Sequence, residues 1–275
     1  MTAEYSEAVH QHSFSIRFFP QHSQRQKITD LNIEIDGCQS FVVTDDSFQN
    51  KKCYGRIAEP HRNFALHIRG KAETGLAIYE EYTDYPFSAI LFKTQTDLTK
   101  PGKNLLNYHQ ALGLHKWEGS YDKALYIMRA IPDVFSYHPG TTEVHETAEN
   151  AFTLGKGVCQ DYAHIMLSLL REEHIPARYV VGMMLGEGAS HAWVEALCGN
   201  YWYGFDPTNN QLVNDEYIRV SCGRDSDDCS IIRGRFYGCG IQQQNESVIV
   251  EEIKERIDSY GSDNCVHWSA DRRNT

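Results

Sequence analysis

The chain has 275 residues, of which 41% are hydrophobic and 23% are charged, a composition typical of globular proteins. Its 37 acidic residues outnumber its 26 basic residues, so the net charge at pH 7 is −11. A surface of this sign repels phosphate backbones and anionic lipids, which argues against nucleic acid or a membrane as a partner. Neither a signal peptide nor a membrane-spanning run is recognisable, so we expect a cytoplasmic protein whose eight cysteines are mostly reduced.

The first part of the chain, up to about residue 92, shows the pattern of β-strands. Hydrophobic residues alternate with polar ones along residues 14–18, 31–35 and 64–68, which is the period of half-buried strands. Several short strands at this spacing favour a β-sandwich of the immunoglobulin type, here without its Cys and Trp hallmarks. We therefore expect an N-terminal β-sandwich domain over residues 1–98.

The pattern changes to helical spacing after Pro101 and Gly102, where we place a second domain over residues 99–275. Four helices are expected, over residues 105–112 and 124–131, from Thr147 to Leu154, and from about Cys159 to just before Ile175. Three strand-like segments follow, at residues 177–185, 191–198 and 201–206. Helices followed by an antiparallel sheet indicate an α+β arrangement. Residues 247–257 fit either a strand or an amphipathic helix.

Cys159 stands at the predicted start of a helix, directly after Gly157 and Val158. The unpaired N–H groups and the positive dipole end of a helix N-terminus favour the thiolate over the thiol. Cys159 is therefore a candidate nucleophile. The simpler interpretation, a small buried hydrophobic residue, is the one we adopt for the other seven cysteines.

Hairpin geometry places His191 and Asp206 near each other. If Gly199 and Asn200 form a two-residue turn, Asp206 lies opposite Trp193, and His191 is its diagonal neighbour on the same face of the sheet. A thiol, an imidazole and a carboxylate form the nucleophile, base and orienting group of a catalytic triad. The same three residue types also suit zinc, which remains an alternative.

Four segments resemble the bacterial transglutaminase-like superfamily: GVCQDYAH at 157–164, IPARY at 175–179, SHAWVE at 190–195 and FDPTNN at 205–210. The segment FSYHPGTT at 135–142, the residues GRD at 223–225 and RG at 233–234, and the N-terminal β-domain are similar to the corresponding parts of that family. The resemblance implies a papain-like core, in which a helix carrying the cysteine packs on an antiparallel sheet. By the same resemblance Cys159 is the nucleophile, His191 the base and Asp206 the orienting group. Relatives in this bacterial branch are commonly called cysteine proteases.

The chemistry that the resemblance implies is attack of the thiolate on an amide carbonyl to give a thioester. Water resolves the thioester in a protease or amidase, and an amine resolves it in a transglutaminase. Gln160 and Tyr137 are candidates for stabilising the oxyanion, and Trp193 for the wall of the substrate cleft. No cofactor, calcium loop or metal site is expected.

Other polar residues receive structural interpretations. His164 lies about 140° around the helix from Cys159, so we expect it to face elsewhere. Asp161 suits the first turn of the helix without a catalytic duty. The acidic residues Asp225, Asp227 and Asp228 are most simply a solvated loop.

Three functions remain in competition. The first is a cysteine hydrolase acting on peptide or protein amides. The second is an acyl- or amine-transferring enzyme on the same core, which would need a primary amine to form its product. The third is a binding module that keeps the fold without the chemistry. Substrate identity and oligomeric state are not encoded in any pattern that we recognise.

Overall fold

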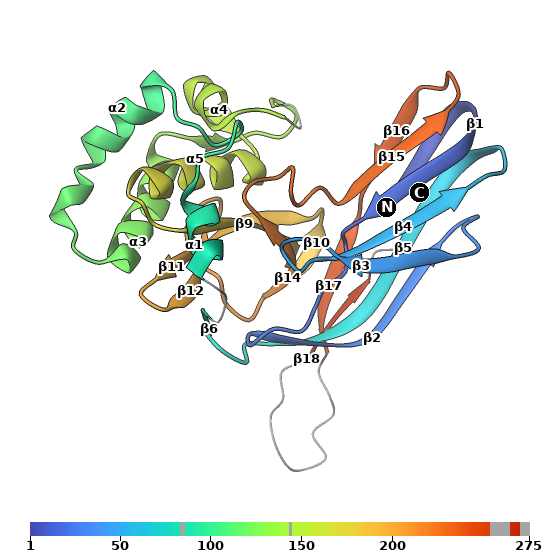
Figure 1. Cartoon of the computed structure of the whole chain (residues 1–275), viewed down its shortest axis with the longest axis horizontal. Helices are drawn as coiled ribbons and strands as arrows, with labels where there is room; N and C mark the ends of the chain where they lie inside the picture. Colours follow the sequence, from blue (N-terminus) through green and yellow to red (C-terminus); the bar gives the residue numbers. More distant parts are fainter. Residues whose placement is uncertain (83–85, 143–144, 254–264, 270–275) are drawn as a thin grey trace, which may run out of the picture.

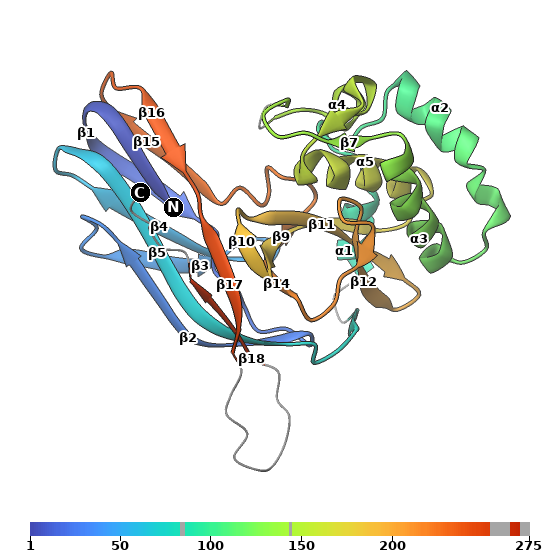
Figure 2. The ribbon, with the colours of Figure 1, turned by 180° about the vertical axis from the view of Figure 1, so that it is seen from behind.

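The computed structural model describes residues 1–82, 86–142, 145–253 and 265–269, and places them in two parts (Figure 1). A large antiparallel sheet forms one part, and the helices form the far side of the other (Figure 1). A second sheet lies between the helices and the large sheet, as the view from behind also shows (Figure 2). No helix of the described ranges is both long and apolar enough to cross a bilayer.

The large sheet has ten strands drawn from both ends of the chain. Its N-terminal strands are β1 (Thr2–Ile16), β2 (Gln26–Ile35), β3 (Phe41–Asp45), β4 (Lys51–Ile57) and β5 (His61–Thr74). Its later strands are β10 (Gly186–Gly188), β15 (Ile232–Tyr237), β16 (Gln242–Asn245), β17 (Val248–Ile253) and β18 (Cys265–Ser269). The long strand β1 pairs with β5 and β16 near its start and with β4 and β15 near its end. These changes of partner along β1 join the strands into one connected sheet.

The second part contains five α-helices and a six-stranded sheet among the described residues. Its helices are α1 (Pro86–Lys93), α2 (Lys103–Leu112), α3 (Ser120–Ala130), α4 (Ala148–Leu154) and α5 (Cys159–Glu172). The sheet consists of β6 (Tyr79–Glu81), β9 (Ala177–Met184), β11 (His191–Cys198), β12 (Tyr201–Asp206), β13 (Gln211–Leu212) and β14 (Tyr217–Gly223). A two-stranded parallel pair, β7 (Ser136–Tyr137) and β8 (Lys156–Gly157), precedes α5.

The two parts share apolar packing across β9 and β14. One face of the second sheet packs against α5, where Met166 and Leu170 are fully buried. Farther along the same face, Met183 and Ile218 belong to the same buried cluster as Phe64 of β5. On the opposite face, Val180 and Trp193 form a separate buried cluster. The position of α5, and of Cys159 at its start, is therefore held by a sheet that is buried from both sides.

The expected helices and the expected hairpin are confirmed. Thr147 caps α4 by accepting a hydrogen bond from the backbone N–H of Asn150, and Gly155 ends the helix in the left-handed conformation. Cys198 pairs with Tyr201, so the two-residue turn sets the register of β11 and β12. The segment that fitted either a strand or a helix is the strand β17 over its described residues.

Two expectations were wrong. Residues 86–93 form a helix rather than a strand, because Ala89 and Phe92, three residues apart, pack together against Trp202. The second domain was expected over residues 99–275, but four strands within that range, β15, β16, β17 and β18, pair into the large sheet. Strand patterning indicates which face of a strand is buried, whereas the partner strand is set by contacts that are distant in sequence.

Candidate active site

The start of α5 is built around the buried carboxylate of Asp161. Its Oδ2 accepts a hydrogen bond from the backbone N–H of Val158 at 2.8 Å and another from the hydroxyl of Thr142 at 2.7 Å. Burial raises the pKa of Asp161, and these hydrogen bonds oppose the rise. A Cβ on Gly157 would lie 2.3 Å from the same oxygen, so only glycine fits there. The residues GVCQD at 157–161 therefore form the local structure that places Cys159 at the N-terminus of α5.

His191 and Asp206 form a close pair where β11 begins and the neighbouring strand β12 ends. The His191 Nε2 lies 2.7 Å from Asp206 Oδ2, and the two side chains are 13% and 0% exposed. Burial lowers the pKa of His191, but hydrogen bonds with Asp206 and Cys159 and the charges of both groups outweigh it and raise the pKa to about 9. Because Asp206 occupies Nε2, only Nδ1 of the ring is left for Cys159. The three candidate residues are therefore brought together.

Asp206 is held by its own turn and by a residue that the sequence analysis missed. Its Oδ1 accepts a hydrogen bond from the backbone N–H of Thr208 at 2.9 Å. Its Oδ2 accepts hydrogen bonds from Asn209 Nδ2 at 2.8 Å and from the Tyr217 hydroxyl at 2.7 Å. Burial raises the pKa of Asp206, yet His191, Tyr217 and Asn209 together lower it below its ordinary value. The Asp-Pro-Thr-Asn turn was a readable signal for part of this network, whereas Tyr217 reaches it only because β14 pairs with β9.

The remaining site candidates separate into two groups. Gln160 lines a groove beside Cys159, and Tyr137 is 51% exposed, with its pKa raised by partial burial and by the charge of Cys159. Trp193 is only 1% exposed, and its ring stacks against that of His191 at 6.3 Å between centroids. Trp193 therefore supports His191 from within the protein, and its expected place in the wall of the substrate cleft stays a prediction.

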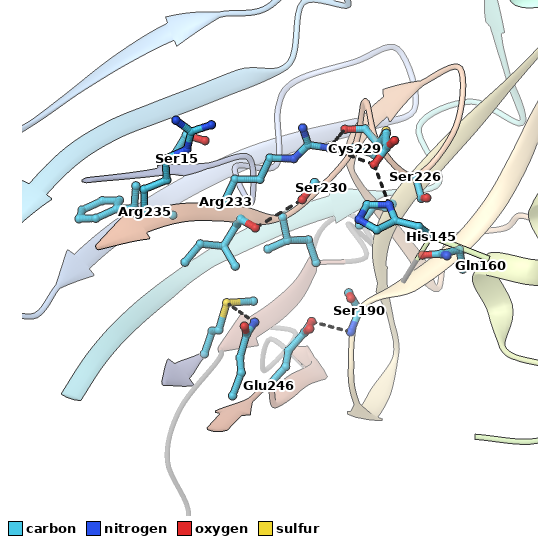
Figure 3. Close-up of a pocket in the computed structure, with 18 of the residues that line it drawn as sticks. Ser15, His145, Gln160, Ser190, Ser226, Cys229, Ser230, Arg233, Arg235 and Glu246 are labelled. Carbon is cyan, nitrogen blue, oxygen red and sulfur yellow. Dashed lines mark hydrogen bonds and ion pairs between the residues drawn. The ribbon is translucent and has the colours of Figure 1, made fainter. Parts of the chain in front are cut away.

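The groove lies between the two parts of the protein and encloses about 1000 Å³. Gln160, His145 and Ser190 face it from the second part, while Ser15, Arg233 and Arg235 face it from the large sheet (Figure 3). Gln160 and Ser190 are the chain neighbours of Cys159 and His191. Cys159 and His191 themselves are not among the residues that line it.

The polar residues given structural roles are more buried than expected. His164 is fully buried beside Tyr179 and accepts the backbone N–H of Ser226, and burial lowers its pKa to about 4 although the charge of Asp225 opposes this. Asp225 is only 5% exposed, and Asp228 is paired with Arg224, so the acidic segment is an ordered structural loop and not simply a solvated one. Within the described part of the chain, no three potential ligands are grouped to hold a metal ion.

Comparison with known proteins gives the family. Residues 112–207 match the transglutaminase-like superfamily, and residues 1–73 match the bacterial transglutaminase-like N-terminal region. An uncharacterized protein of Mycobacterium tuberculosis is 35% identical over 249 residues, which cover 79% of each chain. The chain belongs to the transglutaminase-like superfamily. An uncharacterized Mycobacterium leprae protein is 42% identical over 114 residues, which span 38% of this chain and 40% of that relative.

A solved structure has the same fold as this transglutaminase-like protein. The crystal structure of a candidate cysteine protease from Cytophaga hutchinsonii superposes with a TM-score of 0.67 at 18% identity. The superposition covers 98% of this chain and 96% of that one. The expected α+β class and the transglutaminase-like core are confirmed.

Proposed function

We propose that this chain is a thiol-dependent amide hydrolase that acts on peptides or proteins through a thioester on Cys159. The observation that carries the proposal is the arrangement of His191. Its Nε2 contacts the buried Asp206 at 2.7 Å, and Cys159 at the start of α5 interacts with the same imidazole and raises its pKa. Membership of the transglutaminase-like superfamily supports the same assignment.

The proposed reaction needs three groups and no cofactor. The thiolate of Cys159 attacks the amide carbonyl carbon and forms a C–S bond, while the carbonyl electrons move onto oxygen. As the tetrahedral intermediate collapses, the C–N bond breaks and the imidazolium of His191 gives its proton to the departing amine. His191 then takes a proton from water, which attacks the thioester and releases the acid and the thiolate. Asp206 holds the imidazole and stabilises its charged form throughout.

The proposal predicts that Cys159 reacts with iodoacetamide at a pH where ordinary thiols do not. We would follow labelling of the folded protein from about pH 5 to 9, residue by residue, using peptide mass mapping. Cys239 is exposed and does not line the groove, so it serves as the internal control. Labelling of Cys159 should persist well below pH 7 in the wild type, and in His191→Ala it should need a higher pH.

Labelling of Cys159 that follows Cys239 at every pH would contradict the proposal. If the thiol is activated, product analysis with and without an added primary amine separates hydrolysis from transfer. Whether the reaction is hydrolysis or transfer, Cys159→Ala should abolish it while leaving the thermal unfolding transition in place.

A further inference from the structure

One face of the large sheet concentrates positive charge. On the neighbouring strands β4, β1 and β15, Ser13 pairs with Arg56 on one side and Arg235 on the other. Two residues along, Ser15 pairs with Tyr54 and Arg233 in the same way. Facing partners in antiparallel strands point to the same side of a sheet, so these side chains share one surface. We call this surface the basic face and define it by Ser13, Ser15, Tyr54, Arg56, Arg233 and Arg235.

The charge of the basic face is opposite to that of the whole chain, whose net charge is −11. Arg56 and Arg235 are exposed, and neither has an ion pair with any residue that the structure describes. Arg233 is paired with Asp227, but both side chains remain about half exposed, at 52% and 48%. Two cations of this face are therefore available to an anionic partner, and the third is weakly held.

The basic face is also one wall of the groove whose other side holds Gln160 and Ser190, the chain neighbours of Cys159 and His191. The groove is lined by five residues of this face, Ser13, Ser15, Tyr54, Arg233 and Arg235, whereas Arg56 lies on the same face beside it. Figure 3 shows Ser15, Arg233 and Arg235 across the groove from Gln160 and Ser190. We propose that this groove binds an acidic segment of a polypeptide substrate along the basic face, a proposal that rests on the proposed amide hydrolase. Arg233 and Arg235 are two residues apart on one strand, about 7 Å in distance. An extended peptide repeats at the same interval, so carboxylates at alternate positions would meet both guanidinium groups.

A peptide fits this site better than a nucleic acid does. Tyr54 and the arginines are residue types that also bind single-stranded nucleic acid. However, Asp227 and Glu246 line the same groove and repel anions. A peptide with acidic residues only at alternate positions can place neutral residues beside these carboxylates, whereas a phosphate backbone carries a charge at every nucleotide. Serine hydroxyls and backbone groups that line the groove can form hydrogen bonds with the amides of a polypeptide. The reaction proposed for Cys159 also takes an amide as its substrate.

The test measures binding without chemistry, using the full chain with Cys159→Ala and fluorescence anisotropy. The probes are labelled peptides of equal length in which serine alternates with glutamate, lysine or glutamine, and a single-stranded oligonucleotide. The glutamate peptide should bind more tightly than the other probes. Its affinity should fall as the salt concentration rises, because salt screens exposed charges. Replacing Arg56→Gln and Arg235→Gln together should weaken it about fivefold, the size expected for two exposed ion pairs.

The matched control replaces Arg62→Gln and Arg129→Gln, which removes the same charge from two exposed sites outside both the basic face and the groove. This variant should bind the glutamate peptide like the parent. Equal binding of the glutamate and glutamine peptides, or equal loss in both double variants, would overturn the proposal. Tight binding of the oligonucleotide alone would assign the face to nucleic acid instead.

A second measurement separates this proposal from the proposed function. In the chain with Cys159 intact, the glutamate peptide should slow iodoacetamide labelling of Cys159, and it should lose this effect in the Arg56→Gln/Arg235→Gln variant. If Cys159 labels like Cys239 while the peptide still binds through the two arginines, the hydrolase fails and the acidic-peptide site stands. If Cys159 is activated but unprotected by the peptide, the hydrolase stands and the proposed substrate class fails.

Discussion

Asp206 is oriented before any substrate arrives. Backbone N–H groups of Thr208 and Asn209, the Asn209 amide and the Tyr217 hydroxyl all donate to its two oxygens. A carboxylate held in this way keeps its charge and its direction, which lowers the cost of organising the site during reaction. The charge of Asp206 should therefore be measurable as a change in the pKa of His191.

Replacing Asp206→Asn should lower the pKa of His191 from about 9 toward its ordinary value of 6.5, because a neutral amide cannot balance the imidazolium charge. Titration of the imidazole ring by NMR would measure this change, with His191→Gln to assign the signal. Cys159→Ala should lower the same pKa, since the thiolate is the second group that raises it. A His191 midpoint that is unchanged by both substitutions would contradict the site described above.

The raised pKa of His191 also ties stability to pH in a definite direction. A histidine whose pKa is higher in the folded state stabilises that state fully below its unfolded pKa of 6.5. This contribution is lost as the pH rises through about 9. The stability difference between wild type and Asp206→Asn that arises from His191 should therefore shrink between these two pH values.

Part of this site could be predicted from the sequence. The pairing of His191 with Asp206 follows from a two-residue turn, because the turn sets the register of both strands. The role of Tyr217 does not follow, since it depends on β14 lying beside β9. Whether Trp193 lies in the wall of the cleft or behind it does not follow from the sequence either, because residue type alone does not distinguish the two.

At the scale of single elements, the start of α5 depends on a glycine. Replacing Gly157→Ala would place a Cβ against Asp161 Oδ2, so the carboxylate must move away from Val158 and Thr142. Overpacking of this kind costs about 1–3 kcal/mol of unfolding free energy. Guanidinium unfolding would measure the loss, and iodoacetamide labelling of Cys159 should fall at the same time.

Gly188→Ala is the matched control for this change. Gly188 is exposed, and a Cβ there would meet no atom within 4 Å. Its replacement should change stability by less than about 1 kcal/mol. Equal effects at Gly157 and Gly188 would mean that the carboxylate of Asp161 does not set the start of the helix.

Elements were predicted well where their signals are local. Thr147 and Gly155 delimit α4 through capping and left-handed backbone, both of which are readable in the sequence. The late strands β15 and β16 are different, because their patterns do not say that β1 is their partner. The boundary predicted at residue 98 therefore describes the change in pattern along the chain, while the sheets cross it in space.

At the scale of the whole molecule, the two parts are joined by hydrogen bonds between the backbone of β14 and polar side chains of the N-terminal region. The Asn50 amide donates to the carbonyl of Cys222 and accepts its N–H, both at 2.8 Å. Gln26 makes the same two-way contact with the backbone of Arg219. Amides that pair with a strand backbone in this way replace the hydrogen bonds of a neighbouring strand, so the large sheet completes an edge of the second one.

Replacing Asn50→Ala should therefore destabilise the whole molecule and not only the N-terminal part. It would leave the buried N–H and carbonyl of Cys222 without partners, at a cost of about 2–4 kcal/mol of unfolding free energy. Because the parts share a buried apolar cluster, thermal unfolding should remain one transition at a lower temperature. Asn63→Ala, at an exposed position of β5, should leave that temperature nearly unchanged. Two separate transitions in calorimetry would show that the parts fold independently and that β14 does not couple them.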